Sequence, residues 1–234
     1  MKKGIIIFSR MDSSRLSSKA VVDLNGRNLL QRVIDRAKQV VNADEIILAT
    51  SNREIDYPLR DIAQNEEISF FLGSLENVAE RAYQCAAEKN LEYFARVCGD
   101  RPFICPNLIS EYFDWCEEES LDLATNILGG SFPPGLTTEI IRNSALERIL
   151  DLTNDPYDLE HLTNYFYNNL GNFKVGNRNC YNDWKNVSLV IDNEDDLKRA
   201  RYIFNKLGDN PELESIPNII ELAREWYQKE DHYD

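Results

Sequence analysis

The chain has 234 residues, a formal net charge of −14, 43% hydrophobic residues and 28% charged residues. This composition excludes a disordered chain, and the length suits one globular domain with a small appendage. The acidity disfavours polyanionic partners, so we expect no binding to nucleic acid or to anionic membrane surfaces. Five cysteines without a C-x-x-C pair, and no signal-peptide pattern, predict a cytoplasmic protein with reduced thiols.

The first predicted strand, residues 4–8, is a continuous apolar run typical of a strand buried on both faces. Further strands and helices alternate with it in chain order. We expect strands at 45–50, 68–72 and 93–98, and helices at 29–41, 55–65, 75–89 and 107–118. This order indicates an α/β fold with a mostly parallel, Rossmann-like sheet and helices on both faces. Arg32, Arg36 and Lys38 are predicted on the solvent side of the first helix.

The segment 129–184 has a different character, with Gly and Pro turn signals and many Tyr, Phe and Asn residues. We expect strands and a helix that lie outside the main sheet and cover the site or a partner subunit. A late strand at 187–192 and helices at 194–207 and 215–230 complete a single domain spanning residues 1–234.

Positive charge is concentrated at the start of the chain. Residues 1–40 contain nine Lys or Arg and three Asp, a net charge of +6, which leaves −20 on the rest. Three of these cations, Arg10, Arg15 and Lys19, follow the first strand and are interleaved with serines. Ligands of such sheets bind beyond the carboxyl ends of strands, where Arg, Lys and Ser can hydrogen-bond phosphates. The loop is therefore a candidate triphosphate site without P-loop glycines, and the alternative is a solvated surface loop.

Two aspartates lie at predicted strand ends. Asp100 follows Gly99 after the fourth strand, and Asp192 ends the late strand. Together they could hold Mg²⁺ or Mn²⁺ against phosphates, whereas the alternative roles are a turn and a helix cap. Only His161 and His232 are present, so a metal site built on histidines is not expected.

These motifs resemble the sugar-acid cytidylyltransferases, the CMP-KDO and CMP-N-acetylneuraminate synthetases, and most closely the spore-coat polysaccharide biosynthesis branch. The resemblance covers residues 4 to about 200. It rests on the following motifs in chain order: Arg10-x-x-x-x-Arg15-Leu-x-x-Lys19, Gly73-Ser74-x-x-Asn77-Val78-x-x-Arg81, Arg96-Val-Cys-Gly99-Asp100, Pro134-Gly135-Leu-x-x-Glu139, Glu160-His161-x-Thr163 and Ile191-Asp192-x-x-x-Asp196-Leu197.

The resemblance implies a Mg²⁺-dependent, homodimeric enzyme that transfers CMP from CTP to a small acidic or sugar acceptor for surface polysaccharide biosynthesis. The segment 129–184 would then be an acceptor-side and dimerisation insertion. By position, the implied nucleotide contacts are Arg10, Ser14, Arg15, Lys19, Ser74 and Arg81. The implied catalytic residues are Arg10, Arg15, Lys19 and Asp100, the metal ligands Asp100 and Asp192, and the acceptor contacts Glu139, Glu160 and His161.

The sequence departs from the family pattern at two places. Asp12 replaces a small residue and Ser17-Ser18 replaces Pro-Gly in the first loop, while Pro134 replaces an acceptor-side Arg. These changes predict a looser loop with one negative charge beside its cations. They are also compatible with other functions: an enzyme that uses a different base, an enzyme with a phosphonate or phosphorylated acceptor, or a catalytically silent nucleotide-binding partner. A nucleotide-sugar glycosyltransferase is also considered, although no D-x-D sequence follows the fourth strand.

Overall fold

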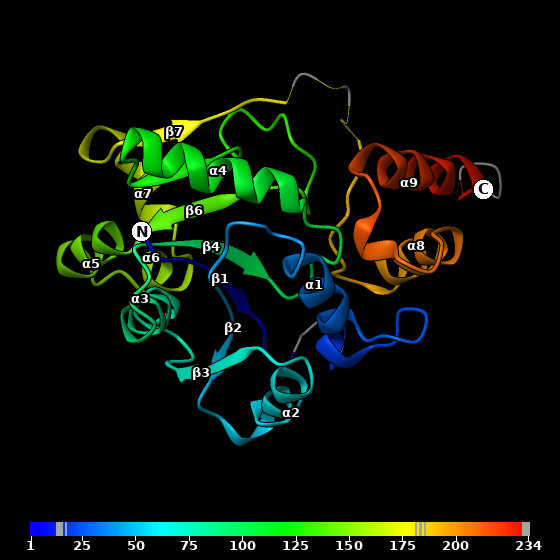
Figure 1. The fold of residues 1–234 in the computed structure, drawn as a ribbon, viewed down its shortest axis with the longest axis horizontal. Coiled ribbons are helices and arrows are strands. Elements are labelled where there is room, and N and C mark those ends of the chain that lie inside the picture. Colours follow the sequence, from blue (N-terminus) through cyan, green and yellow to red (C-terminus); the bar gives the residue numbers. More distant parts are fainter. Residues whose placement is uncertain (13–15, 17, 181, 183, 185, 231–234) are drawn as a thin grey trace.

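A seven-stranded sheet forms the centre of the molecule in the order β3-β2-β1-β4-β6-β5-β7 (Figure 1). The computed structural model describes the chain except residues 13–15, 17, 181, 183, 185 and 231–234. Four strands are mutually parallel: β1 (Lys3–Phe8), β2 (Glu45–Ser51), β3 (Ser69–Gly73) and β4 (Tyr93–Cys98). Strand β6 (Glu139–Arg142) runs antiparallel between β4 and β5 (Leu123–Thr125), and β7 (Val175–Asn177) is parallel to β5.

Helices cover both faces of the sheet because successive side chains of a buried strand point to opposite sides. Ile5 and Ile7 of β1 pack in the core under α1 (Leu29–Ala37), α2 (Pro58–Asn65) and α4 (Pro106–Glu119). Ile6 packs in the opposite core under α3 (Val78–Glu88), α5 (Asn143–Leu152) and α7 (Asn164–Asn168). This architecture confirms the predicted α/β class with a mostly parallel sheet.

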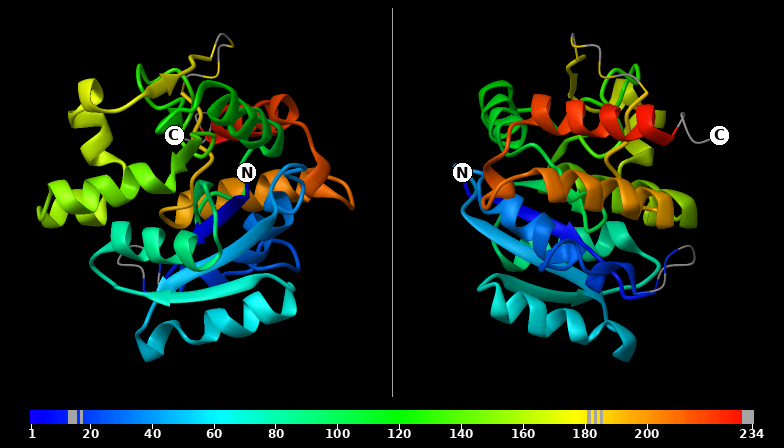
Figure 2. Two further views of the ribbon diagram at one scale, coloured as in Figure 1. Left: turned by 60° about the vertical axis from the view of Figure 1, so that its left-hand side comes forward. Right: turned by 90° about the vertical axis from the view of Figure 1, so that its right-hand side faces the viewer.

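A third apolar core lies beside the sheet. Helices α8 (Glu194–Lys206) and α9 (Ile216–Glu230) lie side by side (Figure 2) and pack with Phe103 and the segment 187–191. That segment was predicted as a strand, which is wrong: it is extended but belongs to no strand of the sheet. Val187, Leu189 and Ile191 alternate inward because they fill this third core, and Leu189 N donates to Pro134 O at 2.8 Å.

The segment 129–184 was predicted to lie outside the main sheet, and this is also wrong, since β6 and β7 extend the sheet itself. The short helix α6 (Pro156–Glu160) follows α5 in the same segment. The acceptor-side and dimerisation role assigned to the segment stays a prediction. None of the helices in the described part of the chain is long and apolar enough to cross a bilayer.

Two arginines predicted on a solvent face are buried instead. Arg32 Nη2 donates to the carbonyls of Leu24 and Asn25, at 2.9 and 2.7 Å. Arg36 Nε donates to Ile104 O at 2.7 Å, and burial lowers its pKa. The third core covers this face of α1, and backbone carbonyls take the place of water as hydrogen-bond acceptors.

All five cysteines lie in the described part of the chain and are free thiols, as expected. Burial raises the pKa of Cys85 and of Cys116 to about 12, so both thiols behave as small apolar groups.

Candidate active site

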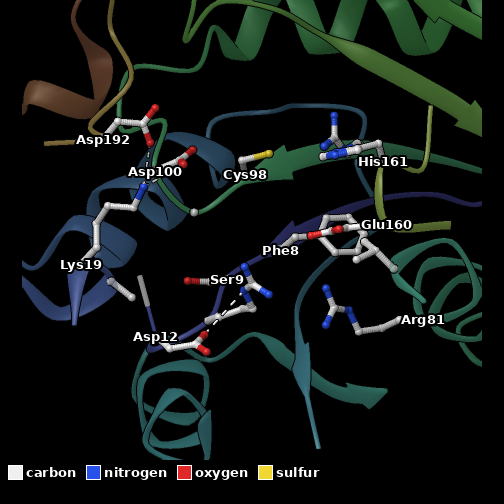
Figure 3. A pocket seen from close by; sticks show the side chains of 15 residues that line it. Phe8, Ser9, Asp12, Lys19, Arg81, Cys98, Asp100, Glu160, His161 and Asp192 are labelled. Atoms are coloured by element: carbon white, nitrogen blue, oxygen red, sulfur yellow. Dashed lines mark hydrogen bonds and ion pairs between the residues drawn. The ribbon is translucent and has the colours of Figure 1, made fainter. Parts of the chain in front are cut away.

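A pocket of about 330 Å³ opens at the carboxyl ends of β1 and β4 (Figure 3). Its walls come from the loop after β1, the end of β4, the helices α3 and α6, and the segment before α8. The structure brings seven of the predicted site residues to this pocket from across the chain. They are Arg10, Lys19, Arg81, Asp100, Glu160, His161 and Asp192.

Gly99 allows the ends of β1 and β4 to lie against each other at the pocket floor. A Cβ atom at this position would lie 2.8 Å from both Cβ and Oγ of Ser9, closer than side chains pack. Gly99 N donates to Phe8 O at 2.9 Å. The absence of a side chain at Gly99 therefore places Asp100 beside the loop that follows β1.

Lys19 joins the two predicted metal ligands. Its Nζ lies 3.0 Å from Asp100 Oδ2 and 3.2 Å from Asp192 Oδ1, and it donates to Ile191 O at 2.9 Å. Ile191 N in turn donates to Asp100 O at 3.0 Å, which holds the segment before α8 against the end of β4. Three charged groups from distant parts of the sequence therefore meet at one point (Figure 3).

The helix-cap alternative for Asp192 is wrong. Asn193 is the N-cap of α8, and its side chain accepts from the backbone N–H groups of Asp195 and Asp196. The Asp192 carboxylate is instead directed to Lys19 in the pocket.

The donor set fits a hard divalent cation. Mg²⁺ prefers oxygen ligands and is commonly held by one or two carboxylates together with substrate phosphates. Asp100 and Asp192 offer two carboxylates that converge on one ammonium group. Within the described residues there is no group of three or more His, Cys, Asp or Glu side chains that could hold a metal. A cation at this point would therefore need phosphate and water oxygens to complete its coordination.

Asp12 does not leave an unpaired negative charge beside the phosphate loop. Arg53 binds it with both arms of the guanidinium and also contacts Asp56, which is fully buried. Asp56 Oδ1 accepts from Met11 N at 2.7 Å. The hydrogen bonds from Arg53 lower the pKa of Asp12. Arg53 and Asp56 follow β2 at the same edge of the sheet, and that position is the signal by which they could have been predicted.

Arg81 is a buried arginine in the pocket wall, only 2% exposed. Its Nη1 donates to Ser74 O at 3.0 Å, and its Nε has no hydrogen-bond partner within the described residues. Burial lowers the pKa of Arg81 to about 10. Gly73 makes room for this side chain, because a Cβ there would lie 2.6 Å from Arg81 Cγ.

Ser74 was predicted as a nucleotide contact, but the structure gives it a different position. It lies outside the pocket lining, and its Oγ accepts from Asn77 N at 3.0 Å. Its carbonyl accepts the hydrogen bond from Arg81, so Ser74 orients a residue of the pocket wall without lining the pocket itself.

Glu139 also lies behind the pocket wall rather than on it. It is 1% exposed, and its Oε2 accepts from Arg96 Nη1 at 2.6 Å, while Arg96 itself lines the pocket. Glu160 and His161 are exposed and line the pocket opposite Asp100 and Asp192 (Figure 3). Arg96 was not predicted as a site residue, because a cation inside a buried strand gives no periodic signal. Ser14, Arg15 and Ser17 lie outside the described residues.

A cation-lined loop and two converging aspartates at the carboxyl edge of a Rossmann-like sheet define a nucleotide-binding enzyme of the nucleotidyltransferase type. Comparison with known proteins agrees with this class. The sequence pattern of the cytidylyltransferase family matches residues 4–231, and the chain belongs to that family.

Individual relatives extend over most of the chain. It is 27% identical over 231 residues to the spore coat polysaccharide biosynthesis protein SpsF of Bacillus subtilis, covering 94% of this chain and 93% of SpsF. It is 30% identical over 141 residues to a 3-deoxy-manno-octulosonate cytidylyltransferase of Pelodictyon phaeoclathratiforme, covering 60% and 51% of the two chains. The solved structure of a cytidylyltransferase from Leptospira borgpetersenii superposes with a TM-score of 0.92 at 25% identity, covering 97% and 96% of the two chains. These similarities confirm the resemblance that the motifs indicated.

Proposed function

We propose that the protein transfers CMP from CTP to a hydroxyl oxygen of a sugar acid or related acceptor in a Mg²⁺-dependent reaction that releases pyrophosphate. The observation that carries this proposal is the convergence of Lys19, Asp100 and Asp192 in the pocket at the carboxyl edge. The names of the relatives support the acceptor class and a role in surface polysaccharide synthesis, since one is a 3-deoxy-manno-octulosonate cytidylyltransferase and another a spore coat polysaccharide biosynthesis protein.

The cations of the first loop bind the triphosphate in this proposal. Arg10 is half exposed at the pocket, and Lys19 reaches the pocket floor, so both can donate to phosphate oxygens. Arg15 and Ser14 keep their predicted roles in the same loop. The acceptor hydroxyl oxygen attacks the α-phosphorus and loses its proton to solvent. The bond from that phosphorus to the α,β-bridging oxygen breaks, and pyrophosphate leaves with the charge that these cations stabilise. Positioning and electrostatic stabilisation therefore supply the rate.

Asp100 and Asp192 would hold the magnesium ion, which neutralises phosphate charge and polarises the reacting phosphoryl group. Lys19 reaches the same point as both carboxylates, so it can serve a phosphate oxygen bound there. Arg81 offers the nucleotide a buried cation whose Nε has no partner among the described residues.

The test is pyrophosphate release with CTP, UTP, GTP and ATP, each with 3-deoxy-manno-octulosonate, N-acetylneuraminate or a sugar phosphate, and with Mg²⁺. The proposal expects release with CTP that depends on a sugar acid. Release with another nucleotide would contradict the cytosine assignment. Binding of CTP without turnover on any acceptor would favour the silent nucleotide-binding partner.

A further inference from the structure

A buried ion pair supports one wall of the pocket. Arg96 Nη1 of β4 donates to Glu139 Oε2 of β6 at 2.6 Å. The Arg96 side chain is 21% exposed and lines the pocket, whereas Glu139 is 1% exposed and lies behind it. The pair therefore presents only its cationic member to a ligand.

Glu139 is fixed from several sides. Its Oε1 accepts from Tyr167 Oη at 2.7 Å, and the nearby Thr163 hydroxyl helps to lower the pKa of the carboxylate. Burial by itself raises the pKa of Glu139, but Arg96 and these hydroxyl groups hold it below its usual range. The carboxylate stays charged and holds the Arg96 guanidinium in one orientation.

Stability alone does not explain such a pair. Removing two charges from water is costly, and an apolar pair of similar volume is often as stable. Arg96 has five N–H donors, and one of them is used in a hydrogen bond within the described residues. Because the side chain is partly exposed at the pocket, the remaining donors are available to a bound molecule.

The local charge favours a monoanion. Glu139 already balances the charge of Arg96, and Glu160 is a further carboxylate in the pocket lining. Arg10, Lys19 and Arg81 are the pocket cations assigned to the nucleotide, whereas the guanidinium fork of Arg96 matches a planar carboxylate in shape and charge.

We propose that Arg96 binds the carboxylate of the acceptor and that Glu139 is a positioning residue that orients it. This inference rests on the proposed function, because the ligand is the acceptor of the same reaction. It assigns Glu139 a role behind the pocket rather than the direct acceptor contact implied by the sequence.

The experiment is calorimetric titration of the enzyme saturated with Mg²⁺ and α,β-methylene-CTP, which does not release pyrophosphate. The probes are 3-deoxy-manno-octulosonate, N-acetylneuraminate, the methyl ester of each, and a sugar phosphate. We expect wild-type enzyme to bind one of the acids at least ~10-fold more tightly than its ester, and Arg96→Lys to lose this preference, since lysine keeps the charge but not the fork. Nucleotide affinity and ester affinity should stay unchanged in Arg96→Lys.

Glu139→Gln tests the positioning role, with Glu118→Gln, an exposed carboxylate on α4, as the control. We expect Glu139→Gln to raise KM for the acid while leaving KM for CTP unchanged, a split that a general loss of folding would not produce. Equal binding of acid and ester, preferred binding of the sugar phosphate, or no binding of either acid would overturn the inference. A parallel loss of nucleotide affinity in Arg96→Lys would overturn it too, because Arg96 would then belong to the nucleotide site.

The two proposals fail in different ways. If wild-type enzyme releases pyrophosphate from CTP with a neutral or phosphorylated acceptor, CMP transfer stands and the carboxylate assignment falls. If an acid binds through Arg96 but no acceptor supports pyrophosphate release, the carboxylate assignment stands and the proposed reaction falls.

Discussion

Arg53 binds Asp12 with both arms of its guanidinium: Nη1 lies 2.6 Å from Oδ2 and Nη2 lies 2.7 Å from Oδ1. This pair ties the loop after β1 to the loop after β2, and Arg53 also contacts the buried Asp56. The sequence alone suggested that Asp12 weakens a phosphate-binding loop. The structure shows that its charge is paired and that it anchors the start of this loop.

Arg53→Ala should raise KM for CTP by about twofold to fivefold, the range expected for a partly exposed ion pair, because Asp12 then repels the triphosphate. Adding Asp12→Ala to that variant should restore most of the affinity. Steady-state kinetics of the single and the double variant measure the rise in KM for CTP and its reversal. Arg60→Ala on the surface of α2 is the control. If the double variant binds CTP more weakly than Arg53→Ala, Asp12 has a direct role that the pairing does not explain.

Lys19→Met should strengthen binding of Mn²⁺ to the nucleotide-free protein while lowering turnover. The ammonium lies between Asp100 and Asp192, so its removal lowers the positive charge beside both carboxylates and takes away a competitor for the metal ion. Electron paramagnetic resonance of free Mn²⁺ measures this binding directly. Lys198→Met, which removes an exposed lysine on α8, is the matched control. Weaker Mn²⁺ binding in Lys19→Met would show that the two carboxylates do not form the metal site.

Arg81→Met should weaken CTP binding by about 1.5–3 kcal/mol, the value of a lost hydrogen bond to a charged group. The melting temperature should change little, because the substitution removes a buried charge that has no carboxylate partner within the described residues. Thermal unfolding with and without CTP separates the two effects. A large fall in melting temperature with unchanged CTP affinity would make Arg81 a purely structural residue.

The pKa of Glu139 predicts one component of the dependence of stability on pH. Its pKa is lowered in the folded protein, so its contribution is fully present above the unfolded value, about 4.3, and is lost as the pH falls through the folded value. Urea unfolding between pH 3 and pH 7 should therefore show a smaller acid loss for Glu139→Gln than for wild type. Parallel curves for the two proteins would mean that Glu139 titrates alike in both states.

The sequence predicted the parts of the site that depend on the first four strands. Runs of apolar residues located β1, β2 and β4 within one or two residues, and the rule that ligands bind beyond the carboxyl ends of strands selected the loops that contain Lys19 and Asp100. The predicted strand before Asp192 is an extended segment, and Asp192 nevertheless lines the pocket. An alternation of apolar residues in the sequence does not distinguish a strand of a sheet from an extended segment packed between helices and a turn.

Other features depend on contacts that no local pattern contains. Arg36 is buried because its guanidinium donates to carbonyls of Ile104 and Glu214, far along the chain from α1. Arg96 and Glu139 meet because β6 inserts beside β4 in antiparallel register. These pairings follow from the order of strands in the sheet, and the segment 129–184 gave too weak a strand pattern to predict that order.

The most direct test of the central claim is pyrophosphate release from CTP, with a sugar acid and Mg²⁺, by wild type and by three aspartate variants. Asp100→Asn and Asp192→Asn each remove one of the two converging carboxylates, and Asp195→Asn changes an exposed aspartate at the start of α8. We expect both pocket variants to lose Mg²⁺-dependent turnover while they keep the wild-type melting temperature, and Asp195→Asn to remain fully active. Full activity in Asp100→Asn and Asp192→Asn would contradict a metal-assisted transfer at this point.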